Sequence, residues 1–333
     1  MKKRNYISAA AVLAAAGVLA GCAADDGEQR YAYPLGTASP EDTVTQIYAE
    51  KFVEEVDRLS EGRIKITVYP NSVLGGDREL LESCYDGDIP FVIQNTAPQV
   101  NFIDDTAVFD APCIFNDIET VRETVDQPEF LEKMQESYRE AGFELLGYAD
   151  QGFRVMSTNK EVTEFADFKG QKIRTMEDAY QLDFWQQLGS NPTPMNFSEV
   201  YIGLQQHTID AQENPYEVIV SNRLYEQQDY IIETNHVPHL ISLVVSEDFY
   251  QDLPEEDQQI LVEAEAIAKE YAREQSDERI DERIQIIRDS GTEIITPGDE
   301  VREQMIVASE PVYEEIQEVV DPEIYSLYTQ NEQ

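Results

Sequence analysis

The sequence predicts an α/β protein of two domains, in which strands and helices alternate along the chain. Size is the first reason, because 312 of the 333 residues remain from Cys22 onward, more than one compact core usually holds. Hydrophobic periodicity is the second reason. Runs with alternating apolar residues, typical of strands, alternate with runs whose apolar residues recur at helical spacing. This βαβα order favours largely parallel sheets that helices cover.

The first half of the chain begins with a strand over 31–38, followed by a helix. Ser39 is the expected N-cap of this helix, with Pro40 at its first position. Its apolar stripe consists of Val44, Ile47, Tyr48, Phe52, Val56 and Leu59. The series continues with a strand over 63–70, a helix over 75–87 and a buried strand over 89–94.

A second series of strands and helices begins near Tyr148. It contains strands over 153–158 and 171–175, a helix over 177–189 that Gly189 ends, and a helix over 198–209 that Ser198 caps. The last long element is a helix from Pro254 to about Ser290, which Gly291 ends. At about 1.5 Å per residue this helix exceeds 50 Å, so it is long enough to lie across two domains.

The N-terminus predicts a lipoprotein signal peptide over residues 1–22. A basic start and a short apolar run from Tyr6 lead into Leu19-Ala20-Gly21-Cys22, a lipobox in which Cys22 becomes lipidated. The run is shorter than the roughly 20 residues that span a bilayer, so we do not expect a transmembrane anchor. Residues 23–30 form a polar tether. We therefore expect a protein at the cell surface or in the periplasm, held to the membrane only by its lipid.

Charge is the most unusual property of the composition. The sequence has 67 acidic and 24 basic residues, which gives a net charge of −43. The acidic residues are scattered along the chain, and such a surface argues against nucleic acid or an anionic membrane surface as a partner. We hypothesise that the protein works in a saline or alkaline medium, where this charge keeps it soluble. An anionic ligand is still compatible, because salt screens charges beyond about 8 Å.

The cysteines and histidines show no spacing typical of a metal site. Cys84 and Cys113 fall in the same predicted domain, and they either form a disulfide or remain two buried thiols. His207, His236 and His239 are too few to indicate a metal cluster. We therefore expect neither a metal nor a cofactor.

Two arginines indicate an anion site. Arg154 and Arg174 each lie in a short strand-like run, so their guanidinium groups are expected to project from strand ends toward a cleft. Arginine suits this role because its planar fork donates two parallel hydrogen bonds to a carboxylate and keeps its charge. The alternative is that both arginines form surface or structural salt bridges.

Several motifs follow one another at short, definite spacing. Between Gly152 and Pro215 the chain reads GFR, FKGQKIRT, NPTPMNFSEVYIGLQQ and DAQENP. Upstream it reads EGRIKITVYPNSVLGGDRELLESCYDGDI, and downstream TNHVPHLISLVVSEDFYQDLPEEDQQ. Over about residues 35–290, these motifs resemble the extracytoplasmic solute-binding proteins of tripartite ATP-independent periplasmic (TRAP) transporters, of the dicarboxylate-binding type.

The resemblance implies a two-lobed fold like that of periplasmic binding proteins. Mixed sheets flanked by helices would form each lobe, with the ligand cleft between the lobes and the long helix across both. Lobe I would comprise residues 31–148 and about 237–275, and lobe II residues 149–236 and about 276–333.

The resemblance also implies the residues of the site. Arg174 would make the main bidentate contact to a ligand carboxylate, Arg154 would support it and Asn214 would complete the clamp. Phe197 would pack on the body of the ligand, although an ordinary core phenylalanine is the alternative. Glu213 is expected to pair with an arginine. By position, the further candidates are Gln94, Asn95, Tyr148 and His236, together with Thr37 or Ser39.

The implied function is capture of a small organic acid and its delivery to the small and large TRAP membrane subunits. A C4-dicarboxylate, a sugar acid or a 2-oxoacid would each suit an arginine-bound carboxylate, and we expect a monomer. One alternative is a secreted enzyme acting on an organic acid, but the sequence shows no G-x-S-x-G, H-E-x-x-H or G-x-x-x-x-G-K motif. A ligand-sensing binding protein is the other alternative.

Overall fold

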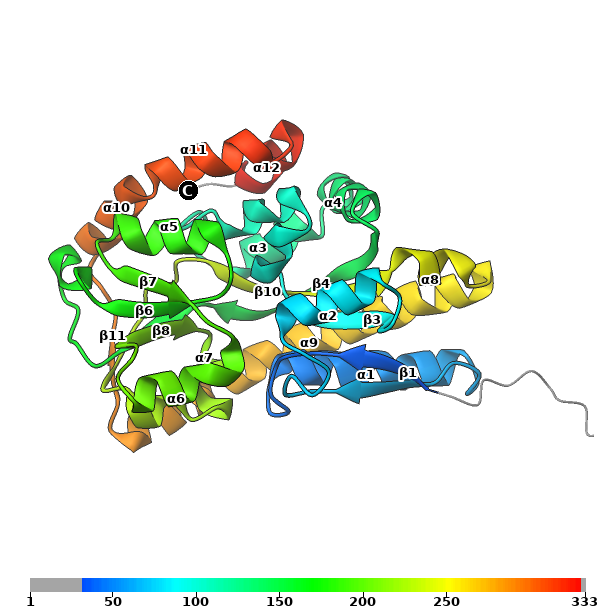
Figure 1. The fold of residues 1–333 in the computed structure, drawn as a ribbon, viewed down its shortest axis with the longest axis horizontal. Helices are drawn as coiled ribbons and strands as arrows, with labels where there is room; N and C mark the ends of the chain where they lie inside the picture. The colour runs from blue at the N-terminus through cyan, green and yellow to red at the C-terminus, as the bar shows by residue number, and fades with distance from the viewer. Residues whose placement is uncertain (1–31, 331–333) are drawn as a thin grey trace, which may run out of the picture. The chain divides into compact units, whose positions relative to one another are not determined.

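The computed structural model describes residues 32–330, and its strands form two mixed sheets, one in each lobe (Figure 1). The first sheet has the order β2 (Ile66–Tyr69), β1 (Tyr33–Gly36), β3 (Phe91–Asn95), β10 (Pro238–Ser246) and β4 (Phe143–Phe153). The second has the order β11 (Glu293–Ile295), β9 (Tyr230–Ile232), β5 (Val155–Thr158), β8 (Ala211–Asn214), β6 (Lys172–Thr175) and β7 (Asn191–Pro194). The predicted signal peptide, Cys22 and the tether lie outside the described residues.

Both sheets are mixed, as the two-lobed fold requires. In the first, β1 pairs in parallel with β2 and β3, whereas β10 lies antiparallel between β3 and β4. In the second, β6 pairs in parallel with β7 and β8, whereas β5 is antiparallel to β8 and β9. The expectation of largely parallel sheets is therefore too simple. A strand that runs parallel to its neighbour needs a long connection, usually a helix, to return the chain to the same end of the sheet. The strands β5 and β10 instead begin directly after the chain crosses from one lobe to the other, and both are antiparallel to their neighbours.

Twelve α-helices and five short 3-10 helices accompany the strands in the described part of the chain. The α-helices are α1 (Val44–Leu59), α2 (Asp77–Tyr85), α3 (Ile118–Val125), α4 (Pro128–Glu140), α5 (Ala179–Gln187), α6 (Val200–Gln205), α7 (Tyr216–Ser221), α8 (Glu247–Asp252), α9 (Glu255–Ser290), α10 (Asp299–Ala308), α11 (Glu310–Val319) and α12 (Pro322–Thr329). The 3-10 helices are Ala97–Asn101, Asp104–Asp110, Phe165–Phe168, Phe197–Glu199 and Leu224–Gln227.

Two predicted helix starts are wrong. Helix α1 begins four residues after Pro40, because the Thr43 side chain accepts a hydrogen bond from Gln46 N and so provides the N-cap. Ser39 and Pro40 belong instead to the loop that precedes it. In the second case, Ser198 lies inside a 3-10 turn and does not cap α6, which begins at Val200.

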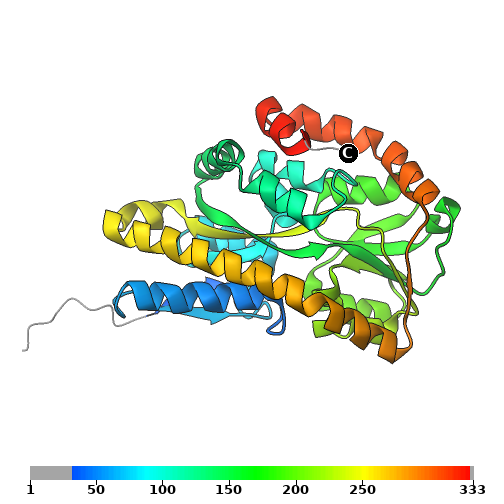
Figure 2. The same ribbon diagram turned by 180° about the vertical axis from the view of Figure 1, so that it is seen from behind.

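Helix α9 joins the two lobes, as its predicted length indicates. Its 36 residues span about 54 Å at 1.5 Å per residue, and it ends at Gly291, whose φ of 97° only glycine adopts readily. The helix contacts α1 and β4 of the first lobe and α7 and β11 of the second (Figure 2). The chain also crosses between the sheets at Arg154 and over residues 233–237.

The C-terminal helices contact elements from both predicted lobes. Helix α11 lies against α5 and against the 3-10 helix Asp104–Asp110, while α12 contacts α3 and α4. We keep the predicted lobe boundaries as a proposal, with this C-terminal segment as a bridge between the lobes.

The two cysteines within residues 32–330 are free thiols in the core. Cys84 and Cys113 are both buried and unpaired, which decides between the two alternatives that the sequence leaves open. Burial raises the pKa of the Cys84 thiol to about 12 and that of Cys113 to about 11, so both stay protonated and unreactive at neutral pH.

Candidate ligand-binding site

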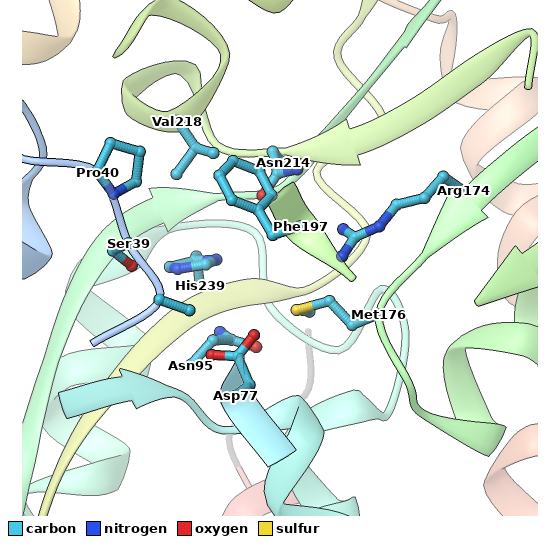
Figure 3. Close-up of a pocket in the computed structure, with 11 residues that line it drawn as sticks. Ser39, Pro40, Asp77, Asn95, Arg174, Met176, Phe197, Asn214, Val218 and His239 are labelled. Carbon is cyan, nitrogen blue, oxygen red and sulfur yellow. The ribbon is translucent and has the colours of Figure 1, made fainter. Parts of the chain in front are cut away.

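A cavity of about 40 Å³ lies between the lobes (Figure 3). The first sheet and its loops contribute Ala38, Ser39, Pro40, Asp77, Asn95 and His239, and the second lobe contributes Arg174, Met176, Phe197, Asn214 and Val218. Several of these residues lie at or just after the carboxyl ends of strands β1, β3, β6 and β8. Ligands of α/β proteins commonly bind at this edge of a sheet, and at interfaces between domains.

Arg174 supplies the positive charge of the cavity. The residue lies in β6 and is 2% exposed, and its Nε and Nη2 donate to the Met195 carbonyl at 2.9 and 2.7 Å. Its Nη1 has no hydrogen-bond partner among the described residues. Burial lowers the pKa of Arg174 to about 10, so the side chain remains charged at neutral pH. It is therefore a fixed cation with unused donors that face the cavity (Figure 3).

Phe197 lies beside this cation. Its ring centroid is 5.9 Å from Arg174 Cζ, a distance at which the ring quadrupole attracts the guanidinium. The side chain is only partly buried and lines the cavity, so it is not an ordinary core phenylalanine. The position agrees with the predicted role of packing on a ligand.

Arg154 lies behind the cavity and not in its wall. The side chain is 1% exposed, and it forms a bidentate ion pair with the Glu213 carboxylate. Its Nη2 also donates to the Glu213 carbonyl at 2.7 Å, and its Nη1 lies 2.6 Å from His239 Nδ1. Burial acts to raise the pKa of Glu213, but Arg154 outweighs it and lowers the value to about 2. The predicted Glu213–arginine pair is confirmed, while the expectation that Arg154 projects into the cleft is wrong.

Asn214 connects the Arg154 network to the cavity. Its Oδ1 accepts from Arg154 Nη2 at 3.3 Å, and its Nδ2 donates to Gln212 Oε1 at 2.6 Å. These bonds fix the orientation of the amide, which lines the cavity at the end of β8. One N–H of the amide is left for a ligand.

The two histidines of this region have different positions. His236 is buried between Glu213 and Thr234, at 3.2 and 2.9 Å, and it stacks on Phe184 outside the cavity wall. His239, which sequence reasoning did not select, lines the cavity. Because arginine only donates, His239 Nδ1 accepts from Arg154 and the ring proton lies on Nε2. Burial and Arg154 hold the pKa of His239 well below its usual range, so the ring is neutral.

Of the remaining predicted residues, Asn95 lines the cavity, whereas Gln94 and Tyr148 do not. Asn95 lines the cavity, but its amide is committed to Leu240 O at 2.8 Å and to Ala97 N at 3.1 Å. Gln94 is the preceding residue of β3, so its side chain points to the opposite face of the sheet. Tyr148 packs in the core, with its ring 5.2 Å from that of Phe109. Gln94, Tyr148 and His236 are therefore not among the cavity-lining residues.

Asp77 is the acidic group of the cavity and was also missed from the sequence. It is the first residue of α2 and is half-buried at the wall opposite Arg174 (Figure 3). Burial raises the pKa of its carboxyl to about 6, even though the charge of Arg174 acts to lower it. Acidic residues are common at the start of a helix, so nothing in the sequence distinguishes Asp77 from an ordinary residue of the first helical turn.

The comparison with known families decides the class of protein. The model of the bacterial extracellular solute-binding proteins, family 7, matches residues 35–319. The chain belongs to this family. The TRAP solute-binding resemblance of the sequence motifs is thereby confirmed.

Proteins that are named for a ligand, or solved with one, are similar to most of this chain. The ectoine/5-hydroxyectoine-binding periplasmic protein of Ruegeria pomeroyi is 31% identical over 78% of this chain and 76% of its own. The crystal structure of the sugar acid binding protein of Advenella mimigardefordensis with galactonate is similar at a TM-score of 0.86 and 25% identity, covering 91% of this chain and 98% of its own. A TRAP periplasmic solute binding protein from Polaromonas bound to D-erythronate has a TM-score of 0.85 and 29% identity, with coverage of 90% and 98%.

Two further observations concern membranes and metals. None of the helices within residues 32–330 combines the length and the apolar composition that a membrane crossing requires. In the same part of the chain, no three His, Cys, Asp or Glu side chains are grouped as metal ligands.

Proposed function

We propose that this protein captures a small organic acid in the cavity and delivers it to the small and large membrane subunits of a TRAP transporter. The free Nη1 of Arg174 is the observation that carries the proposal. A buried guanidinium with unused donors favours a carboxylate, because charge-assisted hydrogen bonds are about twice as strong as neutral ones. Phe197 and Asn214, in the same wall, supply an aromatic surface and an amide donor.

Closure of the two lobes retains the ligand in this proposal. Arg279 and Arg283 of α9 each donate to Asp42 Oδ1 at 2.7 Å, and they contact Glu217 Oε1 at 2.8 and 3.2 Å. Asp42 precedes α1 in the first lobe, and Glu217 lies in α7 of the second. These four side chains therefore join the lobes, and Asp42 and Glu217 lie within two residues of the cavity-lining Pro40 and Val218 in the sequence. A hinge motion would make and break these contacts.

The ligand class and the cellular setting follow from the same proposal. A C4-dicarboxylate, a sugar acid and a 2-oxoacid all present the carboxylate that Arg174 requires. Galactonate and D-erythronate in the solved relatives support a small acid. We further propose that the protein is a monomer outside the cytoplasm, tethered through lipidated Cys22, and that it binds its ligand without catalysis.

A thermal-shift screen tests the proposal. The purified protein is heated with a panel of C4-dicarboxylates, aldonic and uronic acids, and 2-oxoacids. A ligand at 100 times its Kd adds about 2.7 kcal/mol of stability, and the melting temperature rises by several degrees. The shift should disappear in Arg174→Ala. If no acid shifts the wild-type protein, the proposed function is wrong.

A further inference from the structure

The wall of the cavity opposite Arg174 carries a distinct set of polar groups. It contains the Asp77 carboxylate, the His239 imidazole and the Asn95 amide. The Asn95 amide makes two bonds to the backbone, as described above, which leaves one of its N–H groups. Asp77, in contrast, has neither a hydrogen-bond partner nor an ion-pair partner among residues 32–330. The Asp77 carboxylate is therefore left as an acceptor for the far end of a ligand, and the His239 and Asn95 N–H groups as neutral donors.

The charges that line the cavity are one of each sign. Arg174 is the one cationic side chain of the lining and Asp77 the one anionic side chain, within the described residues. Arg154 and Glu213 compensate each other behind the wall. His239 is neutral because its Nδ1 accepts from Arg154. The far end of the cavity thus presents a carboxylate, and the nearby cation Arg78, which lines the adjoining pocket, donates to Glu82 Oε1 at 3.0 Å.

This arrangement has a chemical consequence for the ligand. A hydroxyl group both donates and accepts, so hydroxyls at the far end of a ligand suit the Asp77 carboxylate and the Nε2–H of His239 alike. A cationic nitrogen pairs with Asp77 directly. A second carboxylate, in contrast, would face Asp77 without a counter-charge, and like charges in a partly buried site repel strongly.

We infer that Asp77 determines specificity: the ligand is a monocarboxylate whose far end carries hydrogen-bond donors, and dicarboxylates are rejected. The inference rests on the proposed function and narrows it. Of the classes that the sequence leaves open, sugar acids and other hydroxy acids fit, whereas C4-dicarboxylates do not. Hydroxyl and cationic far ends share the chemistry that Asp77 recognises.

The test compares two acids that differ only at the far end. D-erythronate ends in CH₂OH, whereas meso-tartrate has a carboxylate at that position on the same four-carbon chain. We expect the wild-type protein to bind D-erythronate about 100-fold more tightly at pH 7.5, since two charges near 4 Å repel appreciably at a protein surface. In Asp77→Asn we expect the ratio to fall below tenfold, mainly through tighter binding of meso-tartrate. Isothermal titration calorimetry measures both ratios.

A matched variant and a pH series separate this effect from a general change of charge. Glu79→Gln removes the same charge from an exposed position in the first turn of α2 and should leave the ratio unchanged. Burial holds the pKa of Asp77 near 6, with Arg174, Glu177, Glu79 and Arg154 as the charged groups around it. Binding of meso-tartrate should therefore strengthen as the pH falls through 6 in the wild type, and not in Asp77→Asn.

A second ligand series identifies the donor. Succinate, 4-hydroxybutyrate and 4-aminobutyrate share a four-carbon chain and end in a carboxylate, a hydroxyl and an ammonium group. The inference is supported if the wild type binds 4-hydroxybutyrate or 4-aminobutyrate more tightly than succinate and Asp77→Asn does not. If Asp77→Asn loses about 100-fold in affinity for 4-aminobutyrate alone, the far end of the natural ligand is cationic. Equal binding of meso-tartrate and D-erythronate by the wild type, with other acids still bound, overturns the inference alone. If no acid binds at all, the proposed function fails and the inference fails with it.

Discussion

The substitution Arg174→Lys keeps the positive charge of this side chain but removes the planar guanidinium group, and so tests what the guanidinium geometry contributes to binding. In the wild type, two guanidinium nitrogens hold the Met195 carbonyl and the third is left for the ligand. Lysine keeps the charge but has one nitrogen, which cannot reproduce this planar arrangement. We expect the loss of about one charge-assisted hydrogen bond, worth about 1.5–3 kcal/mol. At about 1.4 kcal/mol per tenfold, the Kd should rise about 10- to 100-fold.

Arg174→Ala removes the charge as well. A buried carboxylate without its partner costs about 3–5 kcal/mol, so binding should weaken at least 100-fold. The unliganded alanine variant should also lose about 0.5–1.5 kcal/mol of stability, because the carbonyl of the half-buried Met195 loses both donors.

Calorimetric titration with the tightest acid of the thermal-shift screen measures these changes. Lys172→Met is the matched control, because it removes an exposed cation from the same strand, where the nearest acidic partner is 4.0 Å away. Its Kd should stay within about twofold of the wild type. An unchanged affinity in Arg174→Lys would show that the ligand carboxylate binds elsewhere.

Three further substitutions test the surrounding structure. Asp42→Asn removes exposed ion pairs between the lobes that are worth about 1 kcal/mol in total, so the Kd for the ligand should rise a few-fold at low salt and less at high salt. An equal rise of the Kd at both salt concentrations would exclude an ionic contribution to closure. Glu213→Gln leaves the buried Arg154 charge unpaired, and urea unfolding should show a loss of about 3–5 kcal/mol. Asp110 and Asp178 are buried beside each other, and burial raises the pKa of both carboxyls, so the folded state retains a proton that the unfolded chain releases above about pH 4. As the pH rises above about 4, this pair should therefore lower the wild-type stability by up to about 1.4 kcal/mol per pH unit. Asp110→Asn should flatten that slope, and parallel slopes in the two proteins would contradict the shared proton.

The sequence motifs located one wall of the cavity well. Arg174, Phe197 and Asn214 come together because each lies at or just beyond the end of a strand in the second lobe, and such positions follow from local patterns. Arg154 shows the limit of this reasoning. Whether an arginine at a strand end faces a ligand or a buried carboxylate depends on its spatial neighbour, and here that neighbour is Glu213.

The opposite wall was predicted less well, because strand pairing determines it. Gln94 and Asn95 are adjacent in β3, so only one of them faces the cavity, and nothing in the local sequence distinguishes them. His239 reaches the site because β10 returns antiparallel between β3 and β4, a pairing of segments about 145 residues apart. Tyr148 lies in β4, at the edge of the first sheet, but aromatic neighbours enclose its ring in the core. Asp77 resembles any acidic residue at a helix start.

The crystal structure of the protein with its tightest acid tests the central claim most directly. We predict a ligand carboxylate oxygen about 2.7–2.9 Å from Arg174 Nη1, with the Met195 contacts retained and Phe197 against the body of the ligand. A carboxylate bound to other groups, with Nη1 of Arg174 still free, would contradict the assignment of Arg174 as the residue that binds the acid.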